Sequence, residues 1–154
     1  MTETTAPGLY LLCRVRGALC ALPLEHVVET MRPLPVEPLA GTPPFVRGVS
    51  IIRGVPLPVV DAALLVNAQH DDPARFVTLR VGGRQVALAV NEVVGVRAIK
   101  PEGFHDLPPL LREVAADVIT SIGALDHELL LTLQSARLVP DSVWATVEAV
   151  GSAS

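Results

Sequence analysis

The stretch RVRGALCALPLEHVV at residues 14–28 returns in a closely similar form, RVGGRQVALAVNEVV, at residues 80–94. Aligned from their first arginines, the two stretches share arginine, valine, glycine, alanine and leucine at matching places and end on the same pair of valines. Each copy holds two short apolar runs separated by an Arg-Gly or Gly-Gly pair. Because glycine readily adopts the positive φ angles of tight turns, each copy predicts a β-hairpin.

The repetition extends beyond the hairpins. Each copy continues into a third apolar segment, EHVVETMR at 25–32 and NEVVGVRAI at 91–99, which suits a strand or a single helical turn; we expect a strand. A proline-rich loop, a strand, a glycine-containing turn and a further strand follow in both copies, with the turns expected at residues 53–54 and 123–124. The whole unit is therefore duplicated, with about five short strands in each copy.

Five short strands suit a small closed barrel, which leaves no exposed sheet edge. The predicted fold class is all-β, with two packed five-stranded barrel lobes at about 9–66 and 75–139 and with short helical segments. Whether the two lobes exchange strands is left open. The 14 prolines, concentrated in connecting loops, fit this better than a helical bundle. Residues 1–8 are expected to be a flexible terminus, and 140–154 a tail or a C-terminal helix with Asp141 as its N-cap and Trp144 packed inward.

The composition of the chain limits the classes of function that it can have. Charged residues make up 18% of the chain, below the roughly 25% of typical soluble proteins, and mean hydropathy is +0.47, so apolar surface remains for protein contacts. A net charge of −4 with scattered basic residues argues against nucleic acid. Because there is no apolar run of about 20 residues and no basic residue before the first apolar stretch, we expect a cytoplasmic protein that does not insert into membranes.

Two cysteines lie symmetrically about the first predicted turn. A hairpin there would set Cys13 across from Cys20 on adjacent strands. A disulfide is one reading. Two buried thiols acting as small apolar side chains are the preferred one, because the cytosol is reducing and directly cross-strand bridges tend to be strained.

Catalytic motifs are missing from the sequence. The histidines, His26, His70, His105 and His127, have no spacing that would gather metal ligands, and no glycine-rich phosphate loop or nucleophile motif is present. We therefore expect no catalytic residue, no metal and no cofactor.

Two charges stand alone inside apolar stretches. Asp61 is expected to cap the segment AALLV that follows it, by accepting from free backbone N–H groups. Arg53 is either an ordinary charge in a hairpin turn or a residue that contacts a partner.

The segment FVRGVSIIRGVPLPVVDAALLV at 45–66 resembles the signature of the CheW family, the adaptors of bacterial chemotaxis arrays. The similarity continues through LYLLCRV, LPLEHVVETM, RVGGRQVALAV and ITSIGALDHELLLTL, in the order found in the family. The resemblance implies two five-stranded SH3-like barrels without catalytic activity. It also implies an adaptor that couples the cytoplasmic tip of a chemoreceptor to the regulatory domain of a CheA-type histidine kinase, at membrane receptor arrays.

The resemblance further implies two binding surfaces. Its receptor groove falls on Val27, Glu29, Arg53, Arg75, Val93 and Val96, and its kinase surface on Val36, Gly48, His105 and Leu110. The valines also suit plain barrel core, and Leu110 also suits a cover for the barrel end.

Other functions stay open at this point. The family often has an asparagine where Ile51 stands, so the partners of this chain are not fixed by the resemblance. The alternative function is a self-assembling or structural CheW-like scaffold, in contact with other CheW-like proteins, in a motility, twitching or gene-regulatory two-component pathway. A barrel that binds a small ligand would need convergent polar groups, of which the chain has few.

Overall fold

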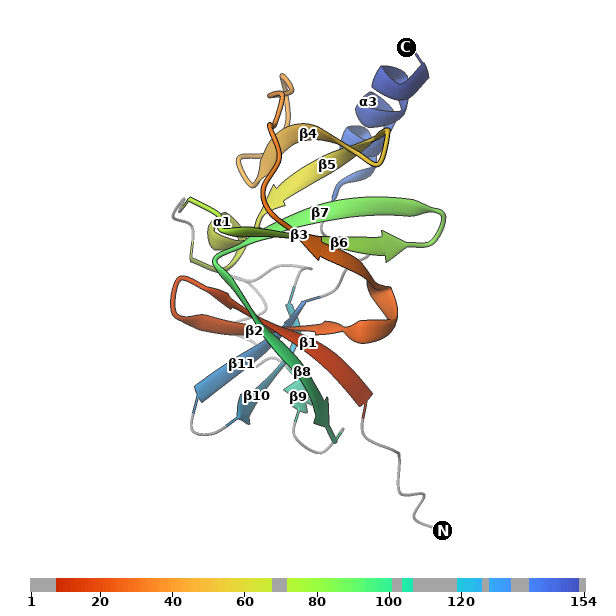
Figure 1. The fold of residues 1–154 in the computed structure, drawn as a ribbon. Coiled ribbons are helices and arrows are strands. Elements are labelled where there is room, and N and C mark those ends of the chain that lie inside the picture. Colours follow the sequence, from red (N-terminus) through yellow and green to blue (C-terminus); the bar gives the residue numbers. More distant parts are fainter. Residues whose placement is uncertain are drawn as a thin grey trace.

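A computed structural model describes residues 8–67, 72–100, 104–106, 119–125, 128–133 and 139–152. Figure 1 shows two sheets, one above the other, with the C-terminal helix beside the upper one. The elements are β1 (Gly8–Val15), β2 (Ala18–Pro23), the 3-10 helix η1 (Leu24–His26), β3 (Val27–Met31), β4 (Val46–Ile52), β5 (Val55–Asp61), α1 (Ala62–Asn67), β6 (Arg75–Val81), β7 (Arg84–Val90), β8 (Glu92–Ile99), β9 (Phe104–Asp106), β10 (Ile119–Leu125), β11 (Glu128–Leu133) and α3 (Asp141–Ser152).

The described strands form one sheet of six, in the order β8-β1-β2-β11-β10-β9, and one of five, in the order β3-β6-β7-β5-β4. The all-β class with two sheets and a C-terminal helix is confirmed. The sheet of six has one strand more than the predicted barrel of five, the three-residue β9. Within the described residues, no helix is long and apolar enough to cross a membrane.

Each sheet draws its strands from both sequence repeats. The first hairpin, β1–β2, pairs with β8 and β11 of the second repeat, and the hairpin β6–β7 pairs with β3 and β5 of the first. The predicted segments 9–66 and 75–139 follow the repeat, and neither contains a whole sheet. The boundaries of the units and of the two termini stay predictions.

The sheet of five closes on itself through the segment that follows β3. Glu37 lies antiparallel to Val49 of β4, and each backbone N–H donates to the other's carbonyl at 2.8 Å. Because β3 and β4 are the two edges of this sheet, the contact joins one edge to the continuation of the other. A closed sheet of this kind leaves fewer backbone groups unpaired than an open one.

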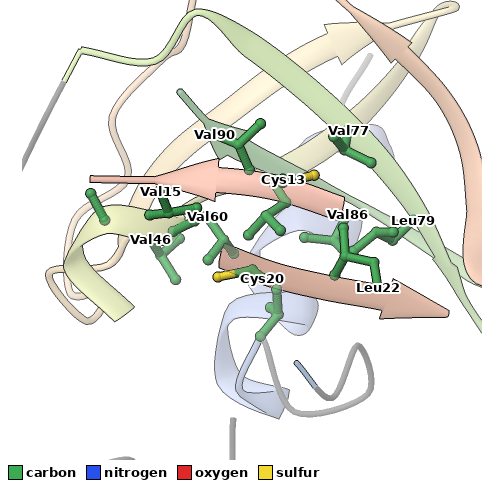
Figure 2. Packing of buried hydrophobic residues seen from close by; sticks show 14 of the residues in the cluster. Cys13, Val15, Cys20, Leu22, Val46, Val60, Val77, Leu79, Val86 and Val90 are labelled. Carbon is green, nitrogen blue, oxygen red and sulfur yellow. The ribbon is translucent and has the colours of Figure 1, made fainter. Parts of the chain in front are cut away.

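The main core lies between the two sheets. Alternate residues of β1 face it, namely Leu11, Cys13 and Val15, and they meet Val86, Leu88 and Val90 of β7. Figure 2 shows side chains of both sheets interleaved there. Two smaller clusters fill the other faces, one around Phe76 in the sheet of five and one around Leu12 in the sheet of six. The period of two along each strand thus serves two cores at once.

The first predicted hairpin is confirmed. Arg16 and Gly17 form its turn with φ angles of 48° and 84°, and Cys13 lies opposite Cys20. Both thiols are free and fully buried in the main core, and burial raises the pKa of each to about 12. The thiols therefore stay protonated and act as apolar side chains at neutral pH.

The expected strands form at Val27–Met31 (β3) and Glu92–Ile99 (β8), whereas Glu25 and His26 of the first segment belong to the 3-10 helix η1. The turn predicted at residues 123–124 is wrong, because Gly123 lies inside β10 and pairs with both Leu130 and Phe104. The strands of this hairpin pair as far as Leu125 and Glu128, so the chain reverses later than the glycine indicated.

The C-terminal helix α3 begins at Asp141. This residue is therefore in the first turn rather than at the N-cap, and the carbonyl of Pro140 accepts from Val143 and Trp144. Trp144 is buried in the main core, as predicted. Its ring also lies under Arg84 of β7, with the guanidinium carbon 5.1 Å from the ring centroid.

Candidate functional site

An ion pair joins the two edges of the sheet of five. Arg53 lies in the two-residue turn between β4 and β5, with a φ of 53°, followed by Gly54 with a φ of 76°. Positive φ at both places is the geometry of a tight hairpin turn. The Arg53 Nη2 and Nε atoms donate to the two carboxylate oxygens of Glu29 on β3, at 2.8 and 3.2 Å. The structure thus brings together two residues of the predicted receptor groove that lie 24 positions apart.

The ion pair is exposed on its arginine side. The Arg53 side chain is 78% exposed and that of Glu29 28%. The hydrogen bonds from Arg53 lower the pKa of Glu29 and raise the pKa of Arg53 itself. The pair is therefore formed at neutral pH and is lost as the pH falls through the lowered pKa of Glu29.

Glu29 sits just after an irregularity in the pairing of β3 with β6. Val27 lies opposite Leu79 and Glu29 opposite Thr78, so Val28 is an extra residue on β3. Such a bulge re-aims the side chains around it. The Glu29 N–H donates to the Thr78 hydroxyl at 3.2 Å, and that hydroxyl donates to the Glu29 carbonyl at 3.3 Å.

The remaining residues of the predicted receptor groove are more dispersed. Val27 and Val93 are partly buried and pack against the main core. Val96, on β8, is 49% exposed. Arg75 begins β6, and its Nη1 donates to the carbonyl of the neighbouring Ala74.

Two residues of the predicted kinase surface, Val36 and Gly48, lie near the pairing of Glu37 with Val49 that closes the sheet. Val36 is partly buried and packs against the Phe76 cluster. It precedes Glu37, which pairs with β4. Gly48 is buried on β4 with a φ of 145°, and a Cβ at this position would lie 2.9 Å from the Cα of Pro38. A groove of about 340 Å³ runs beside them, lined by Leu34, Pro35, Glu37, Leu39, Val49, Ser50 and Ile51.

Of the other two residues of the predicted kinase surface, the structure describes the backbone of one. His105 lies in the short strand β9 opposite Ile122, and its side chain lies outside the described residues. Leu110 lies outside them altogether.

Asp61 is the cap that the sequence predicted. Its Oδ1 accepts from the N–H groups of Ala63 and Leu64 in α1, at 3.0 and 3.3 Å, and its Oδ2 accepts from Arg47 at 3.0 Å. The sequence alone did not predict Arg47 as a partner of Asp61. Among the described residues, no three histidine, cysteine, aspartate or glutamate side chains gather as a metal site would require.

The sequence also matches a known family model. The model describes a CheW-like domain and covers residues 9–143. The chain belongs to the CheW-like family.

A curated relative and a solved structure agree with this assignment. The CheW-like chain is 28% identical, over 118 residues, to the chemotaxis protein CheW of Klebsiella aerogenes; the match covers 75% of this chain and 71% of that one. Its fold is similar to the crystal structure of the scaffolding protein TtCheW from Thermoanaerobacter tengcongensis, with a TM-score of 0.74, 17% identity and coverage of 86% and 97% of the two chains. The predicted resemblance and fold are therefore confirmed.

Proposed function

We propose that this CheW-like chain is a non-catalytic adaptor that couples the cytoplasmic tip of a chemoreceptor to the regulatory domain of a CheA-type histidine kinase. Receptor binding in this proposal centres on Glu29 and Arg53, and kinase binding on the surface around Val36 and Gly48. The adaptor would act in the cytoplasm, recruited to receptor arrays at the membrane. Family membership and likeness to a scaffolding protein support the proposal.

The observation that carries the proposal is the preformed ion pair between Glu29 and Arg53. An exposed ion pair stabilises a fold little, because water screens both charges. A guanidinium already held in one orientation, however, loses little conformational entropy when a partner docks against it. Val28, the residue before Glu29 in the sequence, is exposed, so an apolar side chain is available one residue away from the fixed charges. Apolar anchors with a few charges that fix the register are what an amphipathic helical tip requires.

A second candidate function, a self-assembling scaffold, is favoured by the apolar side chains near the β4–β5 turn. Ile51 and Val55 are both more than half exposed and flank Arg53 in the sequence. A contiguous exposed apolar patch, as distinct from a single exposed side chain, often marks a protein contact. Sedimentation of the chain alone distinguishes the two functions, since a self-assembling scaffold gains mass with concentration in the absence of any partner.

Replacing Arg53 by glutamate is expected to weaken binding to a receptor-tip helical hairpin at least tenfold, because it breaks the ion pair and reverses the charge offered to the receptor. Affinity for the kinase regulatory domain is expected to stay within about threefold. Interferometry with each partner immobilised measures both affinities. Val36→Asp is the matched variant for the other surface and should weaken the kinase complex alone.

A charge-swap variant separates recognition from folding. Glu29→Arg combined with Arg53→Glu rebuilds an ion pair with its charges exchanged. If the receptor reads the charges, this double variant stays defective in receptor binding. Full recovery of binding would mean that the pair serves only the fold, and the proposed receptor site would then be wrong.

A further inference from the structure

Thr78 lies opposite Glu29, one of the two residues of the ion pair, on the neighbouring strand. It lies on β6, is 1% exposed, and its hydroxyl contacts the backbone of Glu29 in both directions. The hydroxyl therefore acts as both donor and acceptor to one residue of the neighbouring strand, at the point where a bulge disrupts the regular pairing.

The Thr78 hydroxyl supplies hydrogen-bond partners to the Glu29 backbone. Because Val28 is an extra residue, the regular pairing of β3 with β6 is interrupted just before Glu29. A backbone N–H or carbonyl without a partner at this partly buried place would be costly. With Thr78 as its partner, the Glu29 backbone is fixed relative to β6, and its carboxylate then lies within 2.8 Å of Arg53.

We propose that Thr78 is a positioning residue, whose hydroxyl holds the Glu29 backbone at the β3 bulge so that Glu29 and Arg53 form the ion pair offered to the receptor. Thr78 is buried and does not itself touch the partner. Its role in binding rests on the proposed receptor site, whereas its effect on Glu29 is a property of the isolated protein.

The test uses Thr78→Val, which keeps the shape and branching of the side chain and removes the hydroxyl. The carbon signal of the Glu29 carboxyl, followed by NMR through a pH titration, is expected to give a higher pKa in this variant, because Glu29 moves away from Arg53. Receptor-tip affinity is expected to fall about three- to tenfold, because the two lost hydrogen bonds to the Glu29 backbone no longer hold Glu29 against Arg53. Kinase affinity should not change.

Two further variants serve as controls. Thr78→Ser keeps the hydroxyl and is expected to restore both the low pKa of Glu29 and receptor binding. Thr42→Val removes another hydroxyl that donates to backbone carbonyls, those of Leu39 and Val46, each at 3.3 Å. It should leave the pKa of Glu29 unchanged.

An unchanged pKa of Glu29 in Thr78→Val would overturn the inference, as would a Thr78→Ser variant that behaves like valine. If Thr78→Val does not fold, hydrogen exchange of the wild-type protein tests whether the Glu29 amide is bonded to Thr78. Slow exchange of this amide supports the contact, and exchange at the rate of an open amide rejects it. A wild-type protein that binds no receptor tip would contradict the proposed function, and the titration would still decide the role of Thr78.

Discussion

Replacing Gly48 by alanine is expected to lower the free energy of unfolding by roughly 4 kcal/mol, a large share of the about 5–15 kcal/mol that typically stabilises a domain. A Cβ at this position would overlap the carbonyl oxygen of Glu37, the atom that accepts from the N–H of Val49. The closure between β4 and the segment after β3 would have to open. Urea unfolding followed by circular dichroism measures the loss.

Gly95 provides a matched control for this substitution. Its φ of 147° is close to the 145° of Gly48, but among the described residues no atom beyond Gly95 and its two chain neighbours lies within 4 Å of a Cβ built on it. Gly95→Ala is therefore expected to cost only the backbone strain, about 1–3 kcal/mol. Equal losses in the two variants would show that the close approach of Glu37 contributes nothing.

The second large effect is expected from Asp61→Ala, about 3 kcal/mol. The Asp61 side chain is 3% exposed, and the substitution removes both the cap of α1 and the carboxylate that accepts from Arg47. Breaking a buried ion pair costs about 3–5 kcal/mol. The value expected here lies at the lower end because Arg47 is partly exposed and can regain water.

Asp61→Asn separates the two roles of Asp61. The amide oxygen can still accept from the N–H groups of α1, whereas the charge beside Arg47 is lost, so a loss of only about 1–2 kcal/mol is expected. Urea unfolding of both variants gives the comparison. An asparagine variant as unstable as the alanine variant would contradict a separate contribution from the cap.

Much of the fold could be predicted from the sequence, because it depends on local patterns. The Arg-Gly pair at Arg16 fixed a hairpin, and the hairpin set Cys13 opposite Cys20. The lone Asp61 before an apolar segment indicated a helix cap correctly. The turn at Gly123 failed because a glycine marks a turn only where the strand pairing ends, and here the pairing continues beyond it.

The site was less predictable, because its parts meet only through long-range pairing. Glu29 and Arg53 were both named from the family resemblance, but their ion pair depends on the closure of the sheet. Thr78 was missed, although a threonine within the apolar strand RFVTLRV is a recognisable signal of a buried hydrogen bond. The bulge that makes its hydroxyl necessary has no signature in the sequence of β3.

The measurement that tests the adaptor function most directly is whether this chain links two partners that do not bind each other. A kinase regulatory domain and a receptor-tip helical hairpin, mixed with and without the protein, are followed by analytical ultracentrifugation. An adaptor of this kind gives one complex that contains all three components, and this complex is lost with Arg53→Glu. A folded protein that binds neither partner, or that binds one only by displacing the other, would contradict it.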